Sequence, residues 1–283
     1  VLVDGWVDSS AERSVRPRVS VSLSPPGGGP VTRGSFRVRA IEPGDTARVR
    51  FRVPVAGSPK LWAPEKPQLY DARLTVRVGD QLSGEQRDRV GLRRVQVRDG
   101  RLWLNGRRLT LRGASIQEDM PGRGPALNDA DIERIVDDLQ EVGANVTRAH
   151  YLLDERLLDR LDEEGILVWS QAPVYHRDVQ LRTAAGRERE LGSVRRTVLE
   201  ARRHPSVVAH SVANELSPIP DENPTTRDWL NAARELVQDL DPSVPPSVDV
   251  LGWPSFPRQR TYGRFPLIGI NSYFGWYRGA GER

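Results

Sequence analysis

The sequence predicts two domains of different class, an immunoglobulin-like β-sandwich over residues 1–95 and an incomplete (β/α)8 barrel over residues 96–283. In the first domain, short segments alternate apolar and polar residues with period two, which is typical of half-buried strands. In the second, apolar strands alternate with amphipathic helical segments, which predicts a parallel sheet covered by helices. Polar residues gather where those strands end, as at the active-site end of a barrel.

Four alternating segments predict strands of the sandwich: Val19–Leu23, Phe36–Arg39, Val49–Val53 and Leu74–Val78. Pro25–Pro30 and Pro43–Asp45 are turn clusters between them. Short antiparallel strands at this spacing are typical of an immunoglobulin-like sandwich. Val1–Asp4 begins like a strand already under way. We therefore expect a fragment or a processed product whose sandwich lacks its first strand.

The passage between the domains contains a stiff loop and two tight turns. Leu61–Tyr70 combines two prolines with two aromatic residues, which predicts a rigid crossing between strands. A hairpin over Val95–Leu104 has Asp99–Gly100 as its turn, because Asp-Gly between alternating apolar residues favours a tight hairpin. A second turn at Asn105–Gly106 leads into Leu109–Ala114, the predicted first strand of the barrel.

The barrel is predicted to contain six strands and four helices. The strands are 109–114, 145–148, 166–169, 207–213, 247–250 and 267–270, and the helices are 129–142, 154–164, 193–203 and 226–240. Six units exceed what a small doubly wound domain needs, whereas a closed barrel needs eight strands. We therefore expect two strands of the barrel to be missing from this chain.

Composition excludes several classes of function. Hydrophobic residues make up 37% and charged residues 28% of the 283 residues, as in a soluble globular chain, and no apolar run is long enough to cross a bilayer. The absence of cysteine excludes disulfides, thiolate metal sites and a cysteine nucleophile. The net charge of +4 comes from arginines interleaved with Asp and Glu, so we expect a solvated surface and neither a nucleic-acid nor a membrane partner. Polyanion binding is the alternative interpretation of this charge.

The stretch His204–Pro218 contains the leading candidate for a catalytic group. Val207–Ala213 predicts a buried strand, and it runs directly into Asn214 and Glu215. A glutamate at the carboxyl end of a barrel strand, beside an amide, is suited to act as a general acid. Position alone leaves a second interpretation, in which Glu215 caps the next helix or faces water.

Other polar residues follow other predicted strands. Glu118 and Asp119 come after the first strand, and Asn271 and Tyr273 after the sixth. Two adjacent carboxylates at a strand end either belong to a functional site, bind a nearby arginine or cap a helix. His150 follows the second strand in the same way.

Several of these stretches together resemble glycoside hydrolase family 2, the family of β-galactosidases, β-glucuronidases and their relatives. The resemblance runs from about Leu61 to Tyr277. His204–Glu215 is similar to the family segment that ends in Gly-Asn-Glu, and Asn271–Tyr277 is similar to a segment of the β-glucuronidase branch. The other matching stretches are Leu61–Glu65, Val90–Arg93, Asn105–Gly106, Leu111–Gly113 and Arg148–Tyr151.

The resemblance implies a retaining exo-β-glycosidase that acts on a β-linked glycoside or oligosaccharide by double displacement. Glu215 would be the acid/base, and Asn214 would hydrogen-bond the sugar 2-hydroxyl. The other implied substrate-binding residues are His150, Asn271, Tyr273, Tyr277, Glu118 and Asp119. The alternative is that His150 is a packed barrel histidine and that the aromatic and amide residues only fill space.

Two departures from the family pattern concern the mouth of the pocket. Gln117 stands where the family usually has His, and Ser170–Gln171 stands where it often has Asp-Glu. Both remove a charge or a titratable group, so we predict no metal and no cofactor. The family's nucleophile is a Glu on the seventh strand, after Tyr277, and Glu282 is the only carboxylate there. We expect the nucleophile to be missing from this chain.

The missing nucleophile makes a second hypothesis necessary: a catalytically silent carbohydrate-binding or scaffold protein, if the chain ends at Arg283. Asn271–Tyr277 favours a glucuronide or a galactoside as the sugar. Both a cytoplasmic and a secreted location are open, as is a homo-oligomer of the full-length protein.

Overall fold

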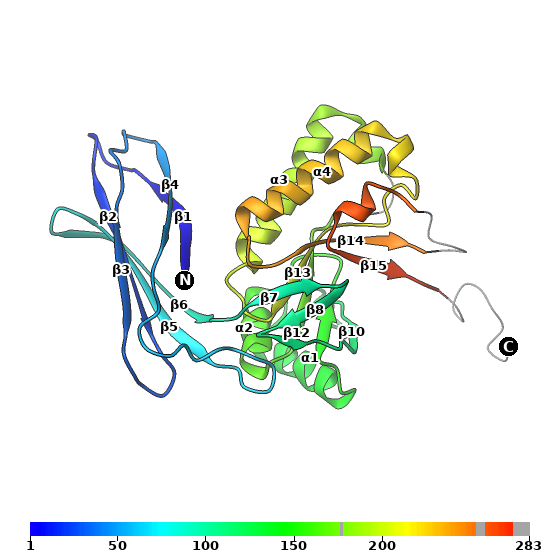
Figure 1. The fold of residues 1–283 in the computed structure, drawn as a ribbon, viewed down its shortest axis with the longest axis horizontal. Helices are drawn as coiled ribbons and strands as arrows, with labels where there is room; N and C mark the ends of the chain where they lie inside the picture. The colour runs from blue at the N-terminus through cyan, green and yellow to red at the C-terminus, as the bar shows by residue number, and fades with distance from the viewer. Residues whose placement is uncertain (176–177, 253–257, 274–283) are drawn as a thin grey trace. The chain divides into compact units, whose positions relative to one another are not determined.

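A computed structural model describes residues 1–175, 178–252 and 258–273 of the chain. It divides into two compact units, residues 1–92 and residues 93–283. The first unit is built from strands, and the second combines strands with helices (Figure 1).

Two antiparallel sheets form the first unit, as the alternating segments predicted. One pairs β1 (Leu2–Asp8) with β4 (Thr46–Arg52). The other has the order β3-β2-β5-β6, from β3 (Thr32–Arg37), β2 (Pro17–Ser24), β5 (Leu69–Val78) and β6 (Gln81–Gly91). On β2, Val19, Val21 and Leu23 are buried, whereas the residues between them face outward. Trp62 is completely buried, so the crossing at Leu61–Tyr70 is anchored by its aromatic side chain.

Three short antiparallel strands open the second unit: β7 (Val95–Arg98), β8 (Arg101–Leu104) and β9 (Arg107–Arg108). At the first turn, Asp99 has φ 49° and Gly100 has φ 67°. At the second, Asn105 has φ 52° and Gly106 has φ 83°. Two consecutive residues with positive φ are the geometry of a tight hairpin turn, and both turns lie where the sequence predicted them.

Six parallel strands then pair in chain order, in the sequence expected of a (β/α)8 barrel. They are β10 (Gly113–Ser115), β11 (Val146–Arg148), β12 (Leu167–Gln171), β13 (Val207–Asn214), β14 (Pro246–Leu251) and β15 (Leu267–Asn271). The described part of the second unit therefore contains six of the eight strands of such a barrel.

The first barrel strand is shorter than predicted, and the prediction of a strand over Leu109–Ala114 was largely wrong. The cause is Asn145, whose side-chain Oδ1 accepts the Arg112 N–H at 2.8 Å while its Nδ2 donates to the Thr110 carbonyl at 2.8 Å. These backbone groups are thus bonded to a side chain and not to a neighbouring strand. Regular pairing begins only at Gly113.

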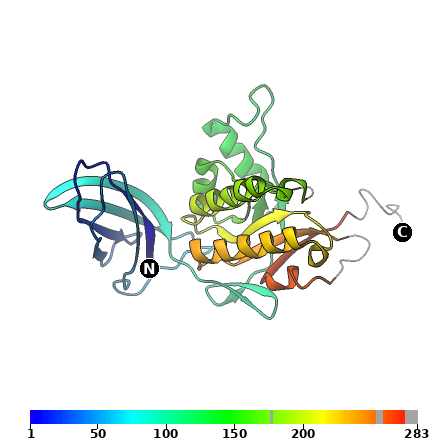
Figure 2. The same cartoon turned by 90° about the horizontal axis from the view of Figure 1, so that it is seen from above.

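Four helices connect the strands: α1 (Asp129–Glu141), α2 (Glu155–Glu164), α3 (Ala184–Ala201) and α4 (Pro224–Leu240). Helix α3 begins at Ala184, earlier than the predicted Ser193, because Thr183 caps it by accepting the Gly186 N–H at 3.0 Å. Figures 1 and 2 show α3 and α4 side by side, and they pack on β13. Among the described residues, no helix has the length and apolar content required to cross a bilayer.

Candidate active site

Polar side chains converge at the carboxyl end of the parallel sheet. Four strands each end on a residue of this group: Arg148 on β11, Gln171 on β12, Asn214 on β13 and Asn271 on β15. Because parallel strands carry their carboxyl ends to one edge of the sheet, residues far apart in sequence meet there. Glu215 follows β13 immediately, at the centre of the group.

The backbone at Glu215 turns sharply out of the sheet. Glu215 has φ 52°, a left-handed conformation that costs energy for any residue with a Cβ. Its N–H donates to the Asp249 carbonyl at 2.9 Å, and the preceding Asn214 N–H donates to the Val174 carbonyl at 2.8 Å. The turn is therefore held from both neighbouring segments, and it points the Glu215 side chain in a fixed direction.

The Glu215 carboxylate is half-buried and receives two hydrogen bonds from neutral donors. Its Oε1 accepts from Asn271 Nδ2 at 2.6 Å and from the Tyr273 hydroxyl at 2.5 Å. Asn223 caps α4 by accepting the Thr226 N–H, so the alternative that Glu215 caps this helix is wrong. The carboxylate is instead bonded to two side chains at the carboxyl end of the sheet.

Asn214 is almost fully buried beside Glu215, and its amide orientation is fixed. Its Oδ1 accepts from both Asn271 Nδ2 and Arg148 Nη2, each at 2.9 Å. Since the oxygen of the amide is occupied by two donors, its Nδ2 is left as the group that can donate to a ligand. Asn271 thus links Asn214 and Glu215 through one amide nitrogen.

Arg148 joins this amide group to a buried carboxylate on β14. Its Nη2 lies 3.1 Å from Asp249 Oδ2, which also accepts the Ser211 hydroxyl at 2.7 Å. Asp249 is 2% exposed, and burial raises the pKa of its carboxyl, although the charge of Arg148 and the Ser211 hydrogen bond act in the opposite direction. The ion pair holds the Arg148 guanidinium in place between Asp249 and the Asn214 amide.

Arg148 also fixes the orientation of His150. The Gln171 Oε1 accepts from Arg148 Nε at 3.1 Å and Nη2 at 2.7 Å, so the amide nitrogen of Gln171 must face the other way. That Nε2 lies 3.2 Å from His150 Nδ1 and donates to it. In neutral His150 the proton then resides on Nε2.

Glu118 lies outside this group. Its Oε1 accepts the Asp154 N–H at 2.8 Å, and its own N–H donates to the Tyr151 hydroxyl at 2.6 Å. Asp154 caps α2, so Glu118 braces the loop that follows His150. Glu118 is buried, and burial raises its pKa. Asp119 beside it is exposed. Tyr277 lies outside the described residues.

The loop after Glu215 is tied to neighbouring segments. Asp178 accepts the Ser217 N–H at 2.7 Å and the Asn223 side-chain amide at 2.9 Å. The buried Tyr262 hydroxyl donates to the Ser217 carbonyl, and burial raises the pKa of this phenol. The segment that carries the candidate acid is therefore fixed on both sides.

The sequence alone gave no role to Arg148, Gln171 or Asp249. Arg148 lies in a stretch that matches the family pattern, and Gln171 is a departure from that pattern, but neither was a site candidate. The sequence does indicate a buried partner for Asp249, because a carboxylate between Val248 and Val250 in an apolar strand would otherwise be unpaired in the interior.

Metal-capable side chains also gather at the amino end of β13. Asp159, Asp162 and His204 are the one such group found among the described residues. Asp162 Oδ2 lies 2.7 Å from His204 Nδ1, and its Oδ1 accepts the Ser206 N–H at 2.9 Å. Ordinary hydrogen bonds therefore account for the two buried members, at the opposite end of the strand from Glu215.

Two family models match the chain and together cover most of it. The model described as glycosyl hydrolases family 2, TIM barrel domain, matches residues 95–282. The model described as glycosyl hydrolases family 2 matches residues 3–93.

Curated relatives include a putative β-glucuronidase of Formosa agariphila, 28% identical over 93% of this chain and 31% of that protein. A β-glucuronidase of Paenibacillus borealis is 31% identical over 78% of this chain and 38% of that protein. The chain thus spans less than two fifths of either relative.

Solved structures with the same fold include a β-galacturonidase from Eisenbergiella tayi bound to galacturonate, with a TM-score of 0.83 and 24% identity. That alignment covers 98% of this chain and 48% of the other. A β-glucuronidase from Bacteroides uniformis aligns with a TM-score of 0.79 and 23% identity over 98% of this chain and 35% of the other.

Proposed function

The chain belongs to the glycosyl hydrolases family 2, and from this premise we propose that it carries the acid/base half of a retaining exo-β-glycosidase. The observation that carries the proposal is the position of Glu215 at the carboxyl end of β13, held by Asn271 and Tyr273. We assign catalysis to residues 96–283 and a positioning role to the sandwich over residues 1–95. The proposed substrate is a β-linked uronide or galactoside.

In the proposed reaction Glu215 acts twice. It first protonates the leaving glycosidic oxygen while a carboxylate nucleophile bonds to the anomeric carbon. It then removes a proton from water, which attacks the glycosyl-enzyme and releases the sugar. The hydrogen bonds from Asn271 and Tyr273 keep the carboxylate oriented through both steps.

We infer that the nucleophile is supplied by a residue outside these 283 residues. A retaining enzyme needs two carboxyl groups about 5–5.5 Å apart, both able to reach the substrate. Among the described residues, Asp249 is the carboxylate in contact with the Glu215 network, but it is 2% exposed and bonded to Arg148 and Ser211. Its position suits a support for the site, and not an attacking group.

The remaining proposed sugar contacts use donors whose orientation is fixed. The Asn214 Nδ2 would donate to the 2-hydroxyl, where a hydrogen bond strengthens as positive charge develops on the ring. The His150 Nε2–H would donate to a second hydroxyl. Asn271, Tyr273 and Tyr277 would line the same pocket.

Glu215→Gln tests the proposal in the full-length protein, with aryl and alkyl β-glucuronides and β-galactosides as substrates. We expect kcat/KM to fall about 10²–10⁴-fold, because the amide cannot supply a proton. The loss should be greater for alkyl than for nitrophenyl glycosides, since a poor leaving group depends more on protonation. Glu222→Gln, at an exposed position seven residues later, should leave the rate unchanged. Unchanged hydrolysis by Glu215→Gln would contradict the assignment.

The 283-residue chain tests the position of the nucleophile separately. We expect it to bind an aryl glycoside in calorimetry without turning it over. Turnover by this chain would place the nucleophile within it and overturn that inference. Sugar binding that persists in the full-length protein without any turnover would favour a catalytically silent carbohydrate-binding protein.

A further inference from the structure

The outward face of the sheet β3-β2-β5-β6 is strongly basic. The strand register places seven arginines and two carboxylates on this face. The arginines are Arg18, Arg33, Arg37, Arg73, Arg77, Arg87 and Arg89, and the carboxylates are Asp71 and Glu85. All of these residues are exposed, because the opposite face of the same strands supplies the core of the sandwich. Positive charge is therefore concentrated on this face of the sandwich.

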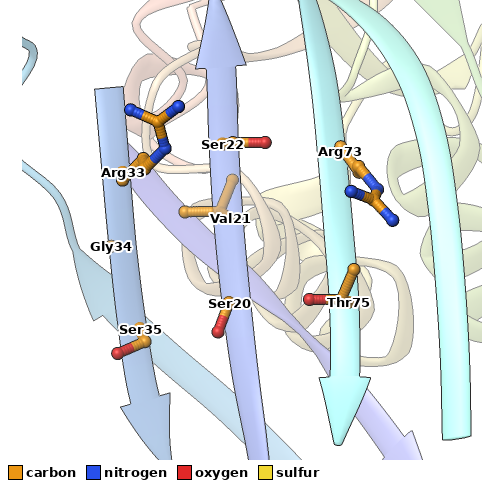
Figure 3. A pocket seen from close by; sticks show the side chains of 8 residues that line it. All are labelled: Ser20, Val21, Ser22, Arg33, Gly34, Ser35, Arg73 and Thr75. Carbon is orange, nitrogen blue, oxygen red and sulfur yellow. The ribbon is translucent and has the colours of Figure 1, made fainter. Parts of the chain in front are cut away.

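The charges are arranged in rows across the strands, with hydroxyl groups between them. Ser22 on β2 is paired with Arg33 on β3 and with Arg73 on β5. Strands lie about 4.8 Å apart, so the two arginines start roughly 10 Å from one another. The next row consists of Ser35, Ser20 and Thr75 (Figure 3). Together these two rows line a hollow of about 400 Å³.

The acidic residues on the face neutralise only part of this charge. Glu85 forms ion pairs with Arg73 at 2.5 Å and with Arg87 at 2.7 Å, and these hydrogen bonds lower the pKa of its carboxyl to about 2. Within the described residues, Arg18, Arg33 and Arg37 have no ion-pair partner. Three guanidinium groups on β2 and β3 are thus available to an anionic ligand.

We propose that this face binds an acidic polysaccharide, a chain of sugars that carries carboxylate groups. The inference rests on the proposed function, because the relatives named above include enzymes named for glucuronate and galacturonate. A guanidinium fork matches a carboxylate through two parallel hydrogen bonds. The serine and threonine hydroxyls between the arginines match the hydroxyl groups of the sugar rings. The surface would hold the polymer on the protein whose barrel removes its terminal sugar.

The chemistry of the face favours a polysaccharide over other polyanions. Single-stranded nucleic acids are bound by aromatic platforms on which bases stack. The outward positions of β2, β3 and β5 carry arginine, serine, threonine and aspartate, with no aromatic side chain among them. Among the described residues, Leu82 on β6, opposite Arg77, is the one exposed large apolar side chain on this face, and a single such residue is less than the apolar face that inserts into a lipid surface.

Binding of the 283-residue chain to polygalacturonate tests the proposal. The measurement is calorimetry at several salt concentrations, with a neutral glucan and a single-stranded oligonucleotide as comparison ligands. We expect affinity for polygalacturonate that weakens with salt and no affinity for the glucan. The triple variant Arg18→Gln, Arg33→Gln, Arg37→Gln should lose about tenfold in affinity, since each exposed pair contributes modestly.

A matched triple variant separates the face from net charge. Arg108→Gln, Arg195→Gln, Arg196→Gln removes three exposed arginines of the second unit and should bind as the parent does. The single variant Arg33→Gln keeps the test valid if the triple variant is poorly folded. Equal losses in both triples, or no binding by the parent, would overturn the proposal. Tighter binding of the oligonucleotide would also overturn it, in favour of a nucleic acid.

The proposal and the proposed function can fail separately. Glu215→Gln should bind polygalacturonate as the parent does, because Glu215 lies in the other unit. In the full-length protein, the Arg18, Arg33, Arg37 triple should weaken binding to polygalacturonate and leave hydrolysis of an aryl β-uronide unchanged. A matching loss on the aryl uronide would contradict a separate binding face.

Discussion

The two ends of strand β13 both bury polar groups, but they use them differently. In the amino half, His204 is bonded to Asp162 at 2.7 Å and His210 to Asp241 at 3.0 Å, and all four side chains are almost inaccessible. At the carboxyl end, the network around Asn214 leads to Glu215, which is half-buried and has a left-handed backbone. At one end the histidines are bonded to buried carboxylates, and at the other the network leads to a half-buried carboxylate.

Arg93 lies against the amino half of the strand. Its Nη2 donates to the Val207 carbonyl at 2.7 Å and to the His204 carbonyl at 3.2 Å. Burial lowers the pKa of this guanidinium, and the charges of Asp241 and Asp162 act against that effect. A charge away from solvent is costly to leave unpaired, so the carboxylates of Asp241 and Asp162 should contribute to stability at this end. The carboxyl end should contribute to activity.

Asp241→Asn should produce the largest effect on stability. The change removes the negative charge that faces His210 and Arg93 in the interior. We expect the free energy of unfolding of the 283-residue chain, measured by urea denaturation, to fall by about 3–4 kcal/mol. Binding of an aryl glycoside by the folded fraction should not change. Asp137→Asn, at an exposed position of α1, should stay within about 0.5 kcal/mol of the parent. A loss of sugar affinity in Asp241→Asn would contradict the assignment of stability to the amino end and activity to the carboxyl end.

Arg148→Gln should affect both properties, because Arg148 connects the buried Asp249 to the amides beside Glu215. Loss of a hydrogen-bonded charge should cost about 2–3 kcal/mol in the free energy of unfolding. It should also weaken binding of an aryl glycoside, since Asn214 and Gln171 lose their common donor. Adding Asp249→Asn should restore part of the stability and none of the affinity. Full recovery of both would mean that Arg148 serves only as a counter-ion.

Acid should weaken the protein partly through Asp241. Burial alone would raise the pKa of this carboxyl, but the hydrogen bond and charge of His210, together with Ser243 and Arg93, lower it to about 2 from the ordinary 3.8. A lowered folded-state pKa stabilises the protein above the ordinary value, and the contribution disappears as the pH falls through about 2. We expect a loss of about 2 kcal/mol over this range, measured by urea denaturation at each pH. The slope should be shallower in Asp241→Asn, and equal slopes would show that Asp241 is not the responsible group.

The sequence predicted the architecture better than the site. Hairpin turns such as Asp99–Gly100 depend on local chemistry, and buried strands such as Val207–Asn214 depend on local composition, so both are visible in the chain. The short β10 was not predictable in this way, because a side chain 33 residues away from Arg112 bonds its backbone. Helix α3 was detected only in its second half, because its first residues, Ala184 to Gly186, contain no large apolar side chain.

Within the site, Glu215, Asn214 and Asn271 were predictable because each follows an apolar strand in a recognisable motif. The roles of Arg148 and Asp249 depend on the sheet, in which β11, β12, β13 and β14 pair in that order. This order brings two residues about a hundred positions apart in sequence into contact. Glu118 was assigned to the substrate from its position after a strand, whereas the structure bonds it to the cap of α2. Position at a strand end therefore identifies candidates, and the hydrogen bonds decide among them.

The smallest predicted effect concerns the conformation of Glu215 itself. Glu215→Gly and Glu215→Ala both remove the carboxylate and its hydrogen bonds from Asn271 and Tyr273, so they differ mainly in whether a Cβ is present at φ 52°. A left-handed residue with a Cβ costs about 1 kcal/mol or more, whereas glycine adopts this conformation freely. We therefore expect Glu215→Gly to exceed Glu215→Ala by about 1 kcal/mol in the free energy of unfolding, with neither variant active. Equal stabilities would mean that the left-handed backbone at Glu215 costs no measurable free energy. The predicted difference would mean that the chain retains an unfavourable backbone at the one position where the proposed chemistry requires a glutamate.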